Sequence, residues 1–159
     1  MEISDTHKTT TMTTENTQPT AAHKLMGVLA GRWRTEGQTV ETKDARSMKI
    51  AGTDTYEWLP GGFFMVHRAD VHMGQDEAKT LEIIGYDVAT NTYLTTFFDN
   101  QGHTGSYQAT VAQDVWTFRG VADRATLTVG DNTMKAHWER TDDGVHWQDW
   151  MFITLTRVH

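Results

Sequence analysis

A change of hydrophobic period at Gly31 constrains the fold of this chain more than any other feature. Before it, residues 21–29 carry apolar side chains at three- and four-residue spacing, which predicts a short helix. The side chains on that face are Ala22, Leu25, Val28 and Leu29. Thr20 precedes the segment and is a typical N-cap residue. After Gly31 the apolar residues alternate with a period of two, which is typical of β-strands.

Clusters of Gly, Asn and Asp divide the rest of the chain into about ten short segments of β-strand composition. The predicted strands cover residues 31–41, 47–59, 62–73, 78–87, 91–99, 103–112, 114–119, 124–129, 132–140 and 146–158. The connections are short, so consecutive strands are expected to pair as antiparallel neighbours. Such a meander leaves two exposed edges unless the sheet closes on itself. We therefore predict an all-β fold: a single antiparallel meander β-barrel with a short N-terminal helix. A two-sheet sandwich is the alternative.

Composition indicates one folded domain after a polar tail and disfavours several classes of binding partner. Residues 1–20 are rich in Thr and nearly lack apolar side chains, so we predict a disordered tail there and one barrel domain over residues 21–159. The net charge of −7 disfavours nucleic acid and anionic membranes as partners. The chain has no cysteine, no long apolar run and no secretory pattern at its N-terminus. These observations predict a cytoplasmic protein.

Trp33 lies at the predicted junction of helix and strand, where its large apolar side chain is suited to closing one end of a barrel. In the last strand, alternation places six residues on the face that we predict to be interior. They are Trp147, Asp149, Met151, Ile153, Leu155 and Arg157. Arg157 would then stack over Trp33 as a cation–π pair and donate to backbone carbonyls at the closed end. This predicted role is structural.

The number of aromatic residues exceeds what a tightly filled small core needs. The chain has six Trp, six Phe and four Tyr. Large rings with a few inward polar groups are typical of a barrel that holds a small molecule. We therefore predict a cavity for an apolar or aromatic ligand. Its predicted lining residues are Trp58, Met65, His67, Tyr93, Phe97, Tyr107, Trp138, Trp147, Asp149 and Met151.

Two inward polar residues raise an alternative function, an enzyme that uses the same cavity. His67 interrupts an otherwise apolar strand face, and imidazole titrates near neutral pH. Asp149 is predicted to face inward, where a carboxylate needs a partner. With Tyr56 as a proton donor, these residues would support proton transfer, isomerisation or cyclisation of a small organic substrate.

Haem or metal binding is the third hypothesis, through His103, His137 or His146. His137 and Glu139 have the spacing to face the same side of a strand, and His146 could approach them across the final hairpin. A solvated outer face explains these residues better, and we predict no metal site. There is also no nucleophile elbow and no phosphate-binding glycine loop.

Several motifs carry a resemblance that covers about residues 22–158. They are Leu29-Ala30-Gly31-Arg32-Trp33, Tyr56-Glu57-Trp58-Leu59 with Gly61-Gly62, Ile84-Gly85-Tyr86-Asp87, and Phe98-Asp99-Asn100-Gln101-Gly102. With Arg157 at the end of the last strand, the chain resembles the calycin superfamily of lipocalin-like and fatty-acid-binding barrels. Within it, the chain is most similar to an uncharacterised bacterial family of unknown function. The resemblance implies a barrel that encloses apolar ligands and, by analogy, a homodimer.

The nitrobindins are a related branch of ten-stranded barrels. They bind haem through a histidine on the last strand, seven residues before a closing arginine. Counted back from Arg157, that position in this chain is Trp150. The resemblance therefore does not extend to the haem ligand, and no cofactor is expected.

Overall fold

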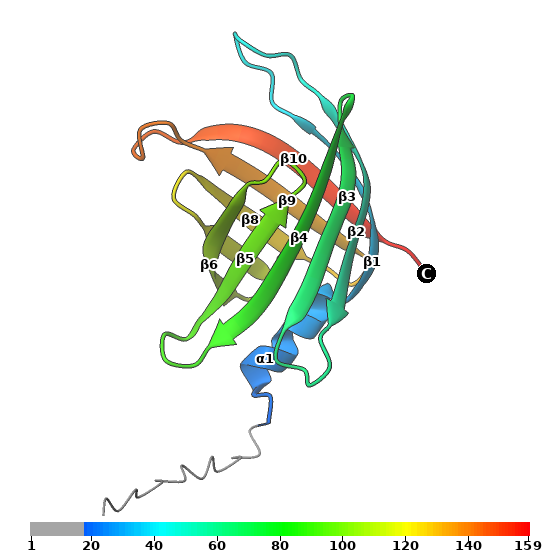
Figure 1. Ribbon diagram of the computed structural model, residues 1–159, viewed down its shortest axis with the longest axis vertical. Helices are drawn as coiled ribbons and strands as arrows, with labels where there is room; N and C mark the ends of the chain where they lie inside the picture. Colours follow the sequence, from blue (N-terminus) through cyan, green and yellow to red (C-terminus); the bar gives the residue numbers. More distant parts are fainter. Residues whose placement is uncertain (1–17) are drawn as a thin grey trace, which may run out of the picture.

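The computed structural model describes residues 18–159 and contains a closed barrel of ten antiparallel strands (Figure 1). The strands are β1 (Gly31–Thr39), β2 (Lys49–Trp58), β3 (Met65–Met73), β4 (Asp76–Asp87), β5 (Thr92–Asp99), β6 (Thr104–Ala112), β7 (Val115–Arg119), β8 (Asp123–Val129), β9 (Thr133–Arg140) and β10 (Gln148–Arg157). Each pairs with its neighbours in the chain, and β1 also pairs with β10. The predicted meander barrel is confirmed, because the pairing of β1 with β10 closes the sheet on itself, which a two-sheet sandwich does not do. The tail predicted over residues 1–20 lies almost wholly outside the described residues.

A short helical segment precedes the barrel. Helix α1 (Ala21–Leu25) continues into the 3₁₀ turn η1 (Met26–Leu29), and Thr20 is the N-cap as predicted. The predicted apolar face is partly wrong. Leu25 and Val28 are each 40% exposed, whereas the buried residues of the segment are His23, Met26 and Leu29. Their spacing of three matches the three residues per turn of a 3₁₀ helix, so the tighter turn rotates a different set of side chains toward the barrel.

The helical segment and the Trp33 side chain close one end of the barrel. Trp33 is fully buried, and its indole nitrogen donates to the carbonyl of Leu29 at 2.9 Å. The Arg157 guanidinium lies 4.2 Å above the Trp33 ring. Its Nη1 donates to the carbonyl of Ala30 at 2.7 Å, and its Nε donates to the carbonyl of Asp131 at 3.1 Å. The contact predicted between Trp33 and Arg157 is therefore present, and it joins the first strand to the last.

Gly31 makes this contact sterically possible. Its φ is 133°, in a region that side chains disfavour. A Cβ at this position would lie 2.6 Å from Nη1 of Arg157. The period change at Gly31 therefore coincides with a position where only glycine leaves room for the guanidinium.

An irregularity in β10 corrects two of the predicted inward residues. The register between β9 and β10 shifts between Asp149 and Met151, so Trp150 is an extra residue opposite β9. A β-bulge reverses the alternation of faces on its two sides. Met151 is therefore paired with the inward residue Trp138, whereas Asp149 is paired with the outward residue Glu139.

The consequence is that Trp147 and Asp149 lie on the outer wall, contrary to the prediction. Asp149 accepts a hydrogen bond from His137 Nε2 at 2.7 Å, and its side chain is 54% exposed. Trp147 lies under the guanidinium of Arg124, 4.2 Å from it, and Arg124 forms a bidentate pair with Glu139.

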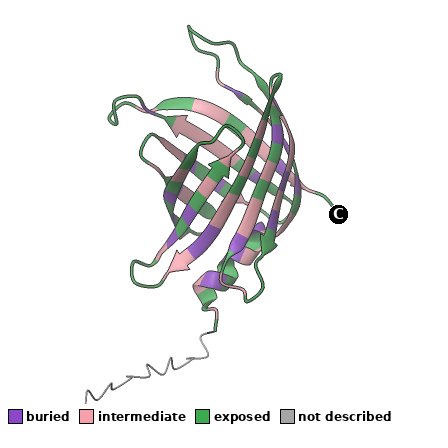
Figure 2. Cartoon of the chain, in the orientation of Figure 1, coloured by how far each residue is buried: buried purple, intermediate pink, exposed green. Residues whose placement is uncertain are grey.

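Inward residues differ in burial along the barrel axis. Near the helix, the inward side chains are packed and buried, with Tyr56, Met65, Ile84 and Tyr93 among them. Toward the opposite end, several inward positions are only half-buried. Figure 2 shows buried and exposed positions alternating along the strands. The inward side chains are therefore packed most closely at the helix end, although Ile50 and Val71 are also buried near the loop end.

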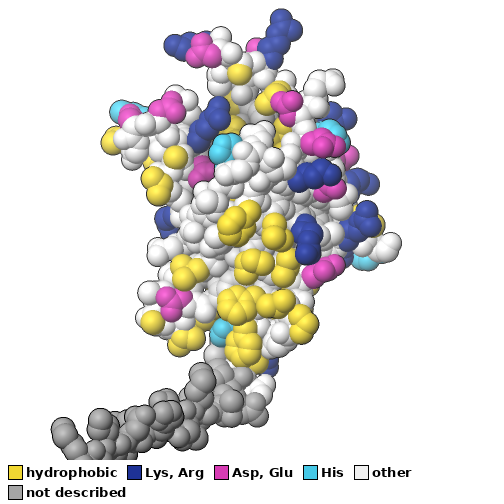
Figure 3. Space-filling model, in the orientation of Figure 1, with side chains coloured by type: hydrophobic (Ala, Val, Ile, Leu, Met, Phe, Trp, Pro, Cys, Tyr) yellow, Lys and Arg dark blue, Asp and Glu magenta, His cyan; other side chains and the backbone are white. Residues whose placement is uncertain are grey.

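The outer wall carries exposed hydrophobic side chains over β4 and β5. Leu81, Leu94 and Phe98 point outward from these strands, and Phe64 lies beside them, covering Gly85. Figure 3 shows hydrophobic side chains gathered on this face of the molecule. Within residues 18–159, no helix has the length and apolar character needed to cross a membrane.

Candidate functional site

Three ionisable side chains meet inside the barrel on three consecutive strands. Asp54 comes from β2, His67 from β3 and Glu82 from β4, and all three share the inward face. His67 Nε2 lies 2.7 Å from Asp54 Oδ1, and His67 Nδ1 lies 2.9 Å from Glu82 Oε1. The side chains are only 9–14% exposed. We refer to Asp54, His67 and Glu82 as the acidic–imidazole cluster.

Two neighbours fix the geometry of this cluster. The Thr35 hydroxyl, from β1, donates to the second carboxylate oxygen of Asp54. The Tyr56 ring stacks on the His67 ring with centroids 4.0 Å apart and an interplanar angle of 4°. A continuous chain of hydrogen bonds therefore runs from Thr35 to Glu82 across four adjacent strands.

The charges of the cluster are strongly coupled. Burial alone would lower the pKa of His67, but hydrogen bonds to Asp54 and Glu82, together with their negative charges, raise it to about 9. His67 is therefore an imidazolium at neutral pH, with both N–H groups donated to carboxylates. Burial, followed by the charges of Asp54 and Glu82, also raises the pKa of Tyr56, which stays a neutral phenol.

Several inward residues near this cluster are only half-buried. These residues come from β3, β4, β5, β9 and β10. They are Ala69, Thr80, Phe97, Ala136 and Ile153, which together define what we call the lumen. Ala69 is paired with both Asp54 and Thr80, and Phe97 is paired with Glu82. The lumen therefore adjoins the acidic–imidazole cluster directly.

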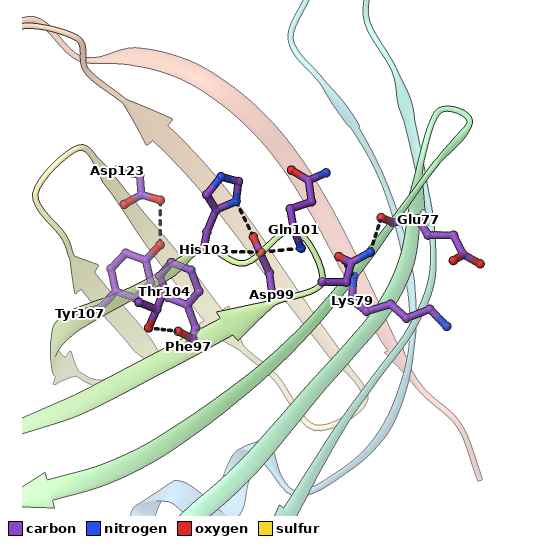
Figure 4. Close-up of polar contacts among 10 residues, drawn as sticks. Glu77, Lys79, Phe97, Asp99, Gln101, His103, Thr104, Tyr107 and Asp123 are labelled. Atoms are coloured by element: carbon purple, nitrogen blue, oxygen red, sulfur yellow. Dashed lines mark hydrogen bonds and ion pairs between the residues drawn. The ribbon is translucent and has the colours of Figure 1, made fainter.

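A second polar pair lies across the interior. The Tyr107 hydroxyl donates to Asp123 Oδ2 at 2.7 Å (Figure 4). Phe97 stacks on the Tyr107 ring, and Trp138 packs against it edge-on. Burial, the hydrogen bond to Asp123 and the charges of Asp123 and Glu82 raise the pKa of Tyr107. These rings form an aromatic wall that begins beside the cluster, because Phe97 is paired with Glu82.

Two hollows also lie in the outer wall, and Tyr107 contributes to the lining of the larger one. Their volumes are about 320 and 220 Å³. Both are lined by the outward-facing residues Leu94 and Thr96, and neither includes a member of the acidic–imidazole cluster. We therefore base the candidate site on the lumen, where ionisable groups and aromatic rings converge.

The structure divides the predicted lining residues into three groups. His67, Phe97, Tyr107, Trp138 and Met151 face the interior around or near the lumen. Met65 and Tyr93 belong to the packed core at the helix end, and Trp58 lies at the end of β2, 36% exposed. Tyr93 also donates from its hydroxyl to the carbonyl of Ala22, which attaches it to the helix. Trp147 and Asp149 lie outside.

The structure also separates Asp149 from the other two residues predicted to be catalytic, His67 and Tyr56. Both nitrogens of His67 are occupied by carboxylates, Asp149 is on the outer wall, and Tyr56 stacks on His67. The sequence analysis missed Asp54 and Glu82. Asp54 shares the parity of Tyr56 in its strand, and Glu82 shares that of Ile84, so alternation alone was a signal for both.

The histidines considered for a metal do not converge. His137 is paired with Asp149, His146 with Asp143, and His103 with Asp99. Across residues 18–159, no group of three His, Asp or Glu side chains is arranged to hold a metal ion.

Haem held in the nitrobindin manner does not fit the residues present. At the position of that ligand, Trp150 packs edge-on against Trp138 and lies beneath the Arg140 guanidinium. An indole N–H only donates hydrogen bonds and offers no electron pair to iron.

Comparison with known proteins places the chain at the level of fold and family. No curated protein matches the sequence. The structure is similar to that of Rv2717c from M. tuberculosis, with a TM-score of 0.66 and 11% identity, over 88% of this chain and 99% of that one. It is also similar to a de novo designed fluorescence-activating β-barrel, with a TM-score of 0.48 and 9% identity, over 85% of this chain and 98% of that one. Residues 18–157 match the model of DUF1579, a family of proteins of unknown function, and the chain therefore belongs to the DUF1579 family.

Proposed function

We propose that this protein binds a small, largely apolar or aromatic molecule in its lumen. One observation carries the proposal: a buried acidic–imidazole cluster adjoins half-buried inward residues and a wall of aromatic rings. Binding sites for small molecules typically combine such apolar walls with a few polar groups in fixed positions.

Stability alone does not explain the cluster, because buried ion pairs contribute little net stability. Removing two carboxylates and an imidazolium from water carries a desolvation penalty that their mutual attraction only partly offsets. An apolar set of similar volume would fill the same space as well or better. Retaining Asp54, His67 and Glu82 beside the lumen is therefore better explained by recognition of a bound molecule.

The resemblance to calycin barrels supports the same function, since those proteins enclose apolar ligands. Motifs that carry this resemblance surround the site: Tyr56 is in the second motif, and Asp99 begins the turn after β5. Asp99 accepts hydrogen bonds from the backbone N–H groups of Gln101 and His103, which orders this turn at the loop end of the barrel (Figure 4).

The proposal is tested by occupying the lumen with a side chain. Ala69→Phe places a ring beside Asp54 and Thr80, whereas the control Ala51→Phe places the same ring on the outward face of the adjacent strand. We expect naphthalene-sized neutral probes such as 2-naphthylmethanol to quench tryptophan fluorescence saturably. The Ala69→Phe variant should bind at least tenfold more weakly, and the Ala51→Phe variant should bind normally. Absence of saturable binding, or binding that Ala69→Phe leaves unchanged, would contradict the proposal.

A second candidate function is proton transfer on a molecule held in the same place. It is favoured by Glu82, which uses Oε1 to contact the His67 imidazolium, while no described residue donates to its Oε2. A carboxylate with one oxygen bound and the other open is suited to act as a general base. Mass spectrometry of the molecule retained by purified protein would supply a substrate to assay. Turnover that survives Glu82→Gln unchanged would rule this function out.

A further inference from the structure

We infer that the lumen selects molecules that donate hydrogen bonds or carry a positive charge and rejects carboxylates, with Glu82 as the anchoring residue. This inference rests on the proposed binding function and specifies the class of ligand. It also distinguishes this barrel from one adapted to fatty acids.

The charges around the lumen favour this class. Asp54 and Glu82 contribute two carboxylates against the single imidazolium of His67. Asp123 adds a third carboxylate at the start of β8, where its hydrogen-bond partner Tyr107 is neutral. Its strand partner Arg140 offsets part of this charge, which leaves three carboxylates against two cationic side chains. The side chains that face one another across the interior therefore carry a net negative charge, and an anionic ligand would be repelled.

The cationic side chains of the barrel lie away from the acidic–imidazole cluster itself. In the strands that carry the cluster, Arg68 and Lys79 point outward and pair with Glu57 and Asp70. Arg157 is inward but lies at the closed end over Trp33. Among the described strands, the remaining inward arginine is Arg140, which is exposed at the rim, opposite Asp123 and beside Trp150. No lysine or arginine of the described strands therefore stands beside the cluster to receive a carboxylate.

The hydrogen-bonding groups near the cluster also favour a ligand that donates hydrogen bonds. Both N–H groups of His67, the hydroxyl of Thr35 and the hydroxyl of Tyr107 are already donated to carboxylates. Glu82 Oε2 receives no hydrogen bond from any described residue, so it is an acceptor that a ligand can use. A ligand N–H or O–H could donate a hydrogen bond to this oxygen, and a charged donor would make the stronger hydrogen bond.

The test compares three probes of similar size and different head groups by isothermal titration calorimetry at pH 7. They are 2-naphthylmethylamine, which is cationic; 2-naphthylmethanol, which is a neutral donor; and 2-naphthoate, which is anionic. We expect the amine and the alcohol to bind the full chain at least tenfold more tightly than the naphthoate. Naphthoate binding as tight as that of the amine would overturn the inference while leaving the proposed function intact. Failure of all three probes to bind would overturn both.

Glu82→Gln tests the role of the anchoring carboxylate. The ratio of amine affinity to alcohol affinity should fall at least tenfold in this variant, because the amide keeps an acceptor but loses the charge. Glu77→Gln is the matched control on the same strand, since Glu77 is outward, exposed and close to His72. It should leave the ratio unchanged. An unchanged ratio in folded Glu82→Gln protein would refute the anchoring role. If that variant does not fold, the relative affinities of the three probes for the natural sequence test the selectivity of the lumen instead.

Discussion

The His67 ring lies parallel to the Tyr56 ring, with 4.0 Å between their centroids. Both nitrogens of His67 contact carboxylates. A cation over an aromatic face is attracted by the negative charge of the ring face. The imidazolium is thus held along its edges by Asp54 and Glu82 and on one face by Tyr56. Its position and its protonation state are set by the same contacts.

The protonation of His67 predicts a loss of stability at alkaline pH. Its pKa is raised from 6.5 to about 9, so its contribution is fully present below pH 6.5 and is lost as the pH rises through 9. A shift of this size corresponds to about 3 kcal/mol of folding free energy. Urea unfolding at several pH values between 6 and 10 should show the natural sequence losing its advantage over His67→Gln across this window. His137→Gln, on the outer wall, should follow the natural sequence, and a constant gap between His67→Gln and the natural sequence would refute the prediction.

Replacing either of two buried threonines with valine is expected to change stability in different directions. Thr35 donates to Asp54, so Thr35→Val leaves a carboxylate oxygen without its donor and should lower the free energy of unfolding by about 1.5–3 kcal/mol. The hydroxyl of Thr95 is buried without a partner among the described residues, so Thr95→Val should leave stability unchanged or raise it by about 1 kcal/mol. Chemical denaturation of both variants measures the difference. Equal destabilisation by the two would show that the hydrogen bond to Asp54 has no special importance.

The outward position of Asp149 predicts that it is dispensable for binding. Asp149→Asn weakens a pair with His137 that is largely solvent-exposed, so we expect a stability change below about 1 kcal/mol. Affinity for 2-naphthylmethanol should be unaffected, as measured by fluorescence titration. A large loss of affinity in this variant would mean that Asp149 reaches the ligand and that the assignment of the outer face is wrong.

Among the substitutions considered, replacement of Trp33 is expected to cause the largest loss of stability. Trp33→Ala removes a fully buried indole that packs under Arg157, and should lower the free energy of unfolding by about 3–5 kcal/mol. Trp33 is paired with Asp54 and Arg157 but with none of the lumen residues, so folded Trp33→Ala protein should still bind the probe. Loss of binding with full stability would show that Trp33 belongs to the ligand site.

Local sequence signals predicted the strands well because each strand is bounded by its own turn. Gly, Asn and Asp mark the turns, and alternation marks the strands between them. The closing contact between Trp33 and Arg157 was also predictable, since both lie at recognisable ends of strands. The face of Asp149 was not, because the bulge at Trp150 depends on how β10 pairs with β9.

The site itself was predictable only in part. His67 stood out as the one histidine within an apolar face, but its meaning depends on Asp54 and Glu82, which reach it from two other strands. Alternation predicts which face a carboxylate occupies and does not predict which side chain on the next strand it will meet. That pairing follows from the register between strands, which the sequence of each strand specifies only weakly.

The pairing of β1 with β10 has a consequence for the order in which the barrel can assemble. All the other strand pairs join neighbours in the chain, so they can form as successive hairpins. The β1–β10 seam instead joins the strands most distant in sequence, which requires the greatest loss of chain entropy. Until β10 is in place, β1 and β9 each present an unpaired edge to other chains. Docking of Arg157 on Trp33 therefore coincides with the removal of the last edges at which this sheet could aggregate.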